Sequence, residues 1–480
     1  MRAYDRCMPI PSAVDQAFFL LETPERPMNV GVLIVLAPTS KLRARFADRL
    51  VARMLECPVG PPFSYRLKPG PIRPLLALEQ DDSIDARRQV HRHSLGRKPS
   101  LETLYARVCA IHVKLLPRDR PLWETHVFTG LSDGRVALYF KTHHGLIDGI
   151  GFLRIVTGIV AESAADPRPH AFWEGMSAAR GAAHEARHLA LTAGGLLQIA
   201  DDVRRTASDL ARLAWHQGLR ALGLGHGLAP PFVTTPDVLR TAPSCNRVLA
   251  HCQVPLRTVK DIGARADAKV NDVMLAALDV AMSRYLERRG TPAKDPLVVD
   301  MPVALHDHGG TGNRITILQV PMGRPGSKPV ERLGQIVAET RELKHEVRTL
   351  SGGSLMLYSI FGHSVASTIE SLGLRDFPLL ANLVISNPAG LAKRVFFNGA
   401  EVELALPVSV VGHQQVLNVT VTTYADTLNV TFIALREALP DLARLAEDTA
   451  EAVAGLARDV GPNARRRRKR ARPAARRTTR

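Results

Sequence analysis

The segment at residues 136–160 constrains the fold of this 480-residue chain more than any other part of it. A run of β type at residues 136–142 leads into the sequence HHGLIDG at residues 143–149, and apolar residues then recur at helical spacing. The sequence therefore predicts a mixed structure in which a strand delivers this loop to a helix. Because rigid elements on both sides fix such a loop, it is a good frame for functional side chains.

The two adjacent histidines of the loop favour a site in which only one imidazole ring acts on the substrate. Successive side chains of a strand point to opposite faces, so His143 and His144 should not hold one metal ion together, and no metal site is expected. Only one imidazole can face a given pocket, which is the arrangement that a single general base requires. Alternatively, Asp148 is simply a helix N-cap, the glycines are turn residues, and both histidines are packed and hydrogen-bonded.

The spacing HHxxxDG at a strand-to-helix junction resembles the signature of the coenzyme-A-dependent acyltransferase superfamily, which includes chloramphenicol acetyltransferase and the condensation domains of peptide synthetases. Further segments are similar, in the same order, to the bacterial wax ester synthase/diacylglycerol acyltransferase family. They are DQAF (residues 15–18), PMNVG (27–31), PLWE (121–124), VNDVMLA (270–276), SNPAG (386–390), ALP (405–407) and LNV (417–419). The resemblance extends over about residues 8–445, whereas a condensation domain would share only the histidine motif.

The resemblance implies an α/β fold, an α+β sandwich of two chloramphenicol-acetyltransferase-like domains with the active site between them. The pattern along the chain agrees, because β-type and helical runs alternate in two regions, separated by a stretch rich in Ala, His, Leu and Arg. We expect an N-terminal domain with the histidine motif at residues 1–165, a helical connector at 166–235, a C-terminal domain at 236–460 and a disordered basic tail at 461–480. The clearest predicted strands are residues 29–37, 135–142, 297–305, 315–322, 382–386, 416–424 and 428–435, and the clearest helices 42–55, 101–113, 270–288 and 441–460.

The family implies an O-acyltransferase that moves a long-chain acyl group from acyl-CoA to the hydroxyl of diacylglycerol, of a fatty alcohol, or of both. An imidazole with an unperturbed pKa near about 6.5 can take the proton of the attacking hydroxyl and return a proton to the leaving thiolate, and His144 is the expected base. Asn271, from the second domain, is the candidate donor to the oxyanion; alternatively, it is only the N-cap of the helix at residues 272–288. By analogy with the superfamily, Asp148 has an architectural role, and Gly149 is expected to adopt a backbone conformation that a side chain would obstruct.

The expected reaction needs neither a cofactor nor an acyl-enzyme. No serine or cysteine stands in nucleophile-elbow spacing, which favours direct transfer. The implied partners are acyl-CoA, as a substrate, and a lipid hydroxyl acceptor, while the oligomeric state stays open. A condensation-type acyltransferase, or a non-catalytic binding protein of the same fold, is the alternative.

Charge is concentrated at the C-terminus of the chain. The net charge is +17, from 63 Lys and Arg against 46 Asp and Glu, and residues 465–480 hold ten basic and no acidic residues. Such a tail attracts anionic membrane surfaces, or binds nucleic acid through phosphates without sequence specificity. In the connector, apolar residues near helical spacing predict an amphipathic helix that lies either on a membrane or lipid droplet or on the protein's own domains.

Composition excludes several other classes of protein. No apolar run reaches the roughly 20 residues that a membrane span needs. The five cysteines have no spacing typical of a disulfide framework or a zinc site, and no signal peptide is apparent. We therefore expect a cytoplasmic protein, associated peripherally with the inner face of the membrane or with lipid bodies.

Overall fold

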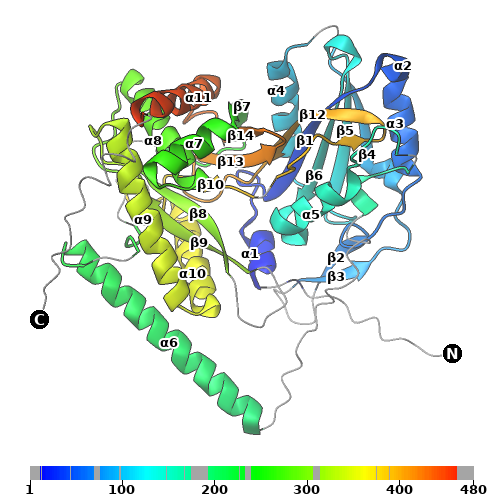
Figure 1. The fold of residues 1–480 in the computed structure, drawn as a ribbon. Coiled ribbons are helices and arrows are strands. Elements are labelled where there is room, and N and C mark those ends of the chain that lie inside the picture. Colours follow the sequence, from blue (N-terminus) through cyan, green and yellow to red (C-terminus); the bar gives the residue numbers. More distant parts are fainter. Residues whose placement is uncertain are drawn as a thin grey trace, which may run out of the picture.

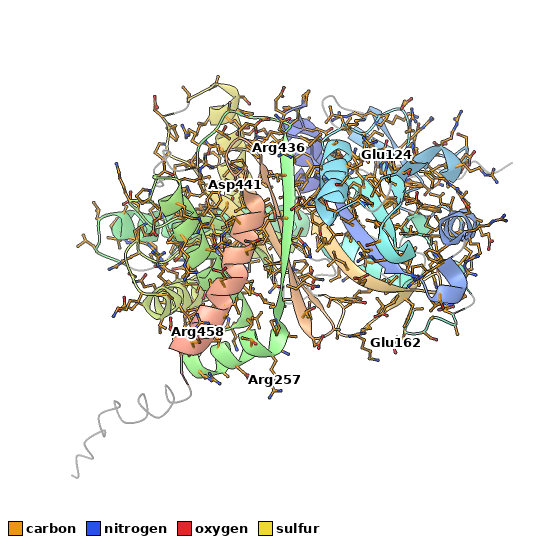
Figure 2. All side chains as sticks on the ribbon, turned by 90° about the horizontal axis from the view of Figure 1, so that it is seen from above. Glu124, Glu162, Arg257, Arg436, Asp441 and Arg458 are labelled. Carbon is orange, nitrogen blue, oxygen red and sulfur yellow. The ribbon has the colours of Figure 1, made fainter. Side chains whose placement is uncertain are left out.

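The structure, a computed structural model, describes residues 11, 13–43, 45–69, 76–96, 99–147, 149–166, 168–174, 193–225, 228–232, 239–305, 314–374, 376–388 and 390–461. In this part of the chain, two six-stranded sheets with helices packed against them form two halves that lie side by side (Figure 1). Figure 2 shows both halves from above, with Glu124 in the first and Arg436 and Asp441 in the second. The fold is therefore mixed α/β, as the sequence predicts.

The first sheet has the strand order β11-β12-β1-β6-β5-β4. Apart from Asn29 at its start, the central strand β1 is apolar, and it is buried on both faces. Val32, Ile34 and Leu36 pack with helices α3 and α5, whereas Leu33 and Val35 belong to the core that includes helix α4. The elements of this half are α1 (Ala13–Leu21), β1 (Asn29–Ala37), α2 (Ser40–Arg43), α3 (Phe46–Leu55), β2 (Tyr65–Pro69), β3 (Leu76–Gln80), β4 (Val90–Ser94), α4 (Leu101–His112), β5 (Trp123–Thr129), β6 (Val136–His143) and α5 (Gly149–Ile159).

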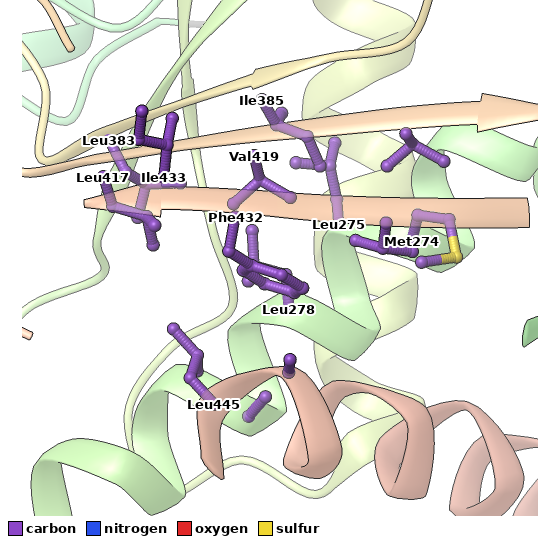
Figure 3. Close-up of a cluster of buried hydrophobic side chains, with 14 of the residues drawn as sticks. Met274, Leu275, Leu278, Leu383, Ile385, Leu417, Val419, Phe432, Ile433 and Leu445 are labelled. Carbon is purple, nitrogen blue, oxygen red and sulfur yellow. The ribbon is translucent and has the colours of Figure 1, made fainter. Parts of the chain in front are cut away.

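The second sheet has the order β7-β14-β13-β10-β8-β9. Helix α8 is buried against it, and Leu275 and Leu278 lie beside Val419 and Phe432 of the strands, with Leu445 of α11 in the same cluster (Figure 3). The elements of this half are β7 (Arg247–Pro255), α7 (Leu256–Ala266), α8 (Val270–Arg288), β8 (Val298–Leu305), β9 (Arg314–Pro321), α9 (Pro329–Thr349), α10 (Gly352–Ser371), β10 (Leu383–Ser386), β13 (Leu417–Tyr424), β14 (Thr427–Leu435) and α11 (Leu442–Asp459).

Two strands from the second half of the chain belong to the first sheet. Strands β11 (Phe396–Phe397) and β12 (Ala400–Val408) extend it, and β12 pairs antiparallel with β1, with Leu406 opposite Leu33. Without β12, β1 would be a long apolar edge strand, which invites aggregation. Both strands lie within the C-terminal domain predicted at residues 236–460, yet they pair in the first sheet. The two segments that pair, β1 and β12, are far apart in the sequence and meet only in the folded chain.

The connector contains one long helix, α6 (Ala193–Ala221). Its C-terminal half packs on the second half of the molecule, where Leu213 is buried and Arg212 donates a hydrogen bond to the Thr349 carbonyl at 2.7 Å. Its N-terminal half extends away from the sheets, and Val203 is 63% exposed (Figure 1). Among the described helices, none has both the length and the apolarity to cross a bilayer.

Most of the predicted strands and helices are present close to their expected bounds, but the helix predicted at residues 42–55 is wrong. It is interrupted between α2 and α3, where Arg45 adopts a left-handed conformation with φ of 57°. Apolar periodicity continues across the break, so the sequence pattern does not show it.

Candidate active site

The histidine motif lies where a fully buried strand ends. Strand β6 lies between β1 and β5, and its last residue His143 is opposite Asn29 of β1. Residues His144–Leu146 form one turn of 3₁₀ helix, and α5 begins at Gly149. Neighbouring strands on both sides therefore fix the position from which the histidines project.

The ring of His143 is buried, and a polar group lies near each of its nitrogens. Its Nδ1 accepts a hydrogen bond from the Gly145 N–H at 3.0 Å, and its Nε2 lies 3.3 Å from Oε1 of Glu22, a contact whose geometry is less favourable than that of a well-directed hydrogen bond. The ring also stacks on Phe19 with a centroid distance of 4.2 Å. Because Nδ1 accepts, the neutral ring carries its proton on Nε2. These contacts hold the His143 ring in one orientation.

The ring of His144 is only partly buried and lies over another aromatic residue of α1. It stacks on Phe18 with a centroid distance of 4.0 Å, and its backbone N–H donates to the Met28 carbonyl at 2.8 Å. The two neighbouring histidines thus stack on two neighbouring aromatic residues of α1. His144 is the more exposed ring.

Helix α1 approaches the histidine turn so closely that only glycine fits at residue 145. A Cβ built on Gly145 would lie 2.5 Å from a ring carbon of Phe19 and 2.9 Å from the Asp15 carbonyl oxygen. At Gly149, by contrast, no described heavy atom lies within 4 Å of such a Cβ. The expected backbone conformation of Gly149 stays a prediction, because it depends on the position of the preceding residue. Asp148 lies outside the described residues.

Glu22 is a residue of this site that the sequence analysis missed. It follows α1, and its side chain is 3% exposed. Burial raises the pKa of this carboxyl group, but His143, the Met28 N–H and Arg118 together outweigh burial and lower the pKa. The carboxylate beside His143 is therefore ionised at neutral pH. No local pattern marks such a residue, because its partners are distant in sequence.

Asn271 is the second residue of α8 and is not its N-cap. The alternative given in the sequence analysis is therefore wrong: Lys269 is at the N-cap position, and its N–H donates to Oδ2 of Asp272 at 2.8 Å. The Asn271 side chain is exposed and accepts a hydrogen bond from Nδ2 of Asn387, which follows β10. Because its Oδ1 faces Asn387, the NH₂ group of Asn271 points away from that residue. Its role as an oxyanion donor stays a prediction.

Two residues of the PLWE segment, Trp123 and Glu124, make contacts that fix strand β5 in the first half. Trp123 is fully buried, donates from Nε1 to the Phe63 carbonyl at 2.9 Å and stacks on Trp173 at 5.1 Å. Glu124 lies 3.7 Å from Nζ of the buried Lys141 on the neighbouring strand. Burial lowers the pKa of Lys141 to about 8, against the attraction of Glu124. These residues hold β5 against β6, which carries the histidines.

The described residues contain no grouping of three or more His, Cys, Asp or Glu side chains able to hold a metal ion. The polar groups nearest the histidines are one carboxylate, one guanidinium and backbone amides, which suit proton transfer and orientation. That the reaction uses no cofactor stays an expectation.

Family models match most of the chain. Residues 12–274 match the wax ester synthase/diacylglycerol acyltransferase catalytic domain, and residues 311–457 match the C-terminal domain of the same family. One relative is a Mycobacterium tuberculosis protein named provisionally as a diacylglycerol O-acyltransferase. It is 31% identical to this chain, and the match covers 92% of this chain and 96% of the relative. A similarly named Mycobacterium bovis protein is 30% identical, over 96% of this chain and 94% of the relative.

Two solved structures share the fold. The wax ester synthase/diacylglycerol acyltransferase from Marinobacter aquaeolei VT8 matches with a TM-score of 0.69 at 23% identity, over 94% of this chain and 100% of the other. The starter condensation domain of rhizomide synthetase, in complex with C8-CoA, matches with a TM-score of 0.52 at 14% identity, over 94% and 95%. The predicted fold class and the predicted family resemblance are confirmed.

Proposed function

The chain belongs to the wax ester synthase/diacylglycerol acyltransferase family, and from this premise we propose that it transfers a long-chain acyl group from acyl-CoA to the hydroxyl of diacylglycerol, of a fatty alcohol, or of both. One observation supports this function most: the motif presents a partly buried imidazole, His144, at the end of a rigid strand, while its neighbour His143 is held among fixed contacts. A positioned neutral imidazole is what the activation of a weakly nucleophilic hydroxyl requires.

The proposed reaction is a direct transfer. His144 accepts the proton of the acceptor hydroxyl as its oxygen attacks the thioester carbonyl, which forms a tetrahedral oxyanion. Collapse of the oxyanion breaks the carbon–sulfur bond, and the imidazolium returns the proton to the coenzyme A thiolate. We assign the oxyanion hydrogen bond to the amide NH₂ of Asn271, a type of contact commonly worth about 3–4 kcal/mol in the transition state. Asp148 would support the loop without touching the substrate.

The acceptor is tested by a thiol-release assay with palmitoyl-CoA. The folded protein is supplied in turn with a diacylglycerol, with hexadecanol and with a primary amine. We expect coenzyme A release to rise above the rate without acceptor for at least one of the two hydroxyl acceptors. Release with the amine alone would favour a condensation-type enzyme, and no release with any acceptor would favour a non-catalytic binding protein.

We further propose that the protein meets its lipid substrates by peripheral contact with the cytoplasmic face of a membrane or with lipid bodies. Both proposed acceptors dissolve poorly in water, so the enzyme must approach a lipid surface. Two observations support the contact: the basic residues 465–480, and apolar side chains exposed on the elements around the connector helix, where Trp215 of α6 and Phe361 of α10 are each 67% exposed.

A further inference from the structure

The segment between α1 and β1 contacts both histidines of the motif. Glu22 contacts the ring of His143, and its Oε1 also accepts the Met28 N–H at 3.1 Å. The carbonyl of the same Met28 accepts the backbone N–H of His144 at 2.8 Å. One carboxylate therefore contacts the ring of the first histidine and, through a single residue, the backbone of the second.

The same segment is joined to the second half of the molecule by a buried ion-pair cluster. The Arg26 side chain is 2% exposed; its Nε and Nη2 bind the two carboxylate oxygens of Glu370 on α10 at 3.0 and 2.7 Å. Its Nη1 donates to the Gln415 carbonyl at 3.0 Å. This bidentate geometry specifies orientation as well as attraction.

His413 completes the cluster and contacts the end of α1. Its Nδ1 lies 2.8 Å from Oε1 of Glu370, and its Nε2 lies 3.0 Å from the carbonyl oxygen of Leu21. Both ring nitrogens of His413 therefore face oxygen atoms that only accept hydrogen bonds. The cluster thus holds residues 21 and 26, which lie on either side of Glu22.

The segment between these anchors is itself a tight turn. The backbone groups of Thr23 and Arg26 exchange hydrogen bonds at 3.1 and 3.2 Å, and the Arg26 N–H also donates to the Thr23 hydroxyl. A shift of α10 relative to the first sheet would therefore move Glu22 and Met28 together. A displacement of about 1 Å at a reacting group can cost a factor of about 10² in rate.

We propose that Glu22 is a positioning residue for the histidine motif, and that the cluster of Arg26, Glu370 and His413 sets the position of Glu22 from the second half of the molecule. This inference rests on the proposed acyltransferase function. Buried ion pairs are costly to desolvate and are weak evidence for stability alone. Here the cluster connects two halves that must jointly form one site.

The first test compares Glu22→Ala with Glu22→Gln. We expect kcat for coenzyme A release to fall about 10²-fold in Glu22→Ala with little change in the KM for palmitoyl-CoA, because orientation is lost and substrate binding is not. Glu22→Gln should recover much of that rate, since its amide oxygen can still accept the Met28 N–H. Glu79→Ala is the matched control, because Glu79 forms an exposed ion pair with Arg66. Wild-type kcat in folded Glu22→Ala would overturn the proposal.

A second readout does not depend on activity. Nitrogen NMR of the imidazole rings reports the tautomer of His143, identified by its loss in His143→Asn. We expect the Nε2–H form in the wild type and a mixed population in Glu22→Ala. An unchanged tautomer would overturn the role of Glu22, whereas an inactive wild type with the expected tautomer change would count against the proposed function alone.

The third test concerns the cluster. Glu370→Gln should lower kcat, and its effect should not add to that of Glu22→Ala, because both act on the same segment. Burial raises the pKa of Glu370, but the hydrogen bond with His413 and the charge of Arg26 outweigh it and lower the pKa to about 2. A carboxyl group with a lowered folded pKa stabilises the fold above its unfolded pKa, and this stabilisation is lost as pH falls from about 4.5 to about 2. The thermal stabilities of wild type and Glu370→Gln should therefore differ at pH 6 and converge near pH 2; fully additive rate effects would contradict the coupling.

Discussion

His143 and His144 are adjacent in the chain, but their rings have different surroundings. His143 is buried between Phe19 and Glu22, and its Nδ1 already accepts a backbone N–H. Nδ1 is thus engaged with the backbone of the turn and Nε2 faces Glu22, so the ring is fixed within the turn. His144 is more exposed and is held through its backbone and by stacking on Phe18. At the residue scale, the ring proposed as the general base and the ring proposed to support it therefore differ in exposure and in contacts.

Gly145 and Gly149 provide a matched pair of substitutions in the same motif. A Cβ at Gly145 would collide with Phe19 and with the Asp15 carbonyl, whereas a Cβ at Gly149 meets no described atom. We expect Gly145→Ala to destabilise the fold by about 1–3 kcal/mol, as overpacking does, and to lower kcat because α1 must move. Gly149→Ala should leave the melting temperature and kcat close to wild type. Thermal unfolding and thiol release measure both, and equal behaviour of the two variants would contradict the packing of α1 on the turn.

At the scale of elements, the sequence predicts best those segments whose own pattern is unambiguous. The helix at residues 270–288 has the predicted bounds, and the strand predicted at residues 29–37 is β1. The position of β12 could not be predicted, because its alternating pattern indicates a strand but not the sheet it joins. Its place beside β1 depends on long-range pairing.

The candidate site likewise has a part that local sequence predicts and a part that depends on distant segments. The placement of His143 on the strand and His144 in the following turn agrees with the predicted junction, because both depend on local sequence. Glu22 and Asn387 were not predicted as site residues, since their partners lie far away in the sequence. The crowding at Gly145 was not predicted for the same reason: it comes from α1, more than 100 residues earlier.

At the scale of the whole molecule, the two halves depend on each other. β12 from the second half extends the first sheet, and the Tyr105 hydroxyl of α4 lies 2.9 Å from Nδ1 of His251 on β7. The Arg26–Glu370 pair joins the segment before β1 to α10. A site built at this junction needs both halves, as the predicted two-domain arrangement implies.

The basic tail gives a prediction at the same scale. Truncation after Gly461 removes ten basic residues and should weaken binding to vesicles that contain phosphatidylglycerol, because each basic residue near an anionic surface contributes up to about 1 kcal/mol. Coenzyme A release in neutral detergent should be unchanged, since no residue assigned to the site is removed. Vesicle co-sedimentation with and without salt measures the effect. Equal binding of the full and truncated chains would remove the tail as a membrane anchor.

The rate of coenzyme A release by His144→Ala tests the central claim most directly. The assay uses palmitoyl-CoA with whichever hydroxyl acceptor the wild type prefers, and His345→Ala, at an exposed position on α9, serves as the control. Loss of a general base typically costs about 10²–10⁴-fold in rate. We predict a loss of that size in His144→Ala with an unchanged melting temperature, and no loss in the control. Near-wild-type release by folded His144→Ala would contradict the assignment of His144 as the base.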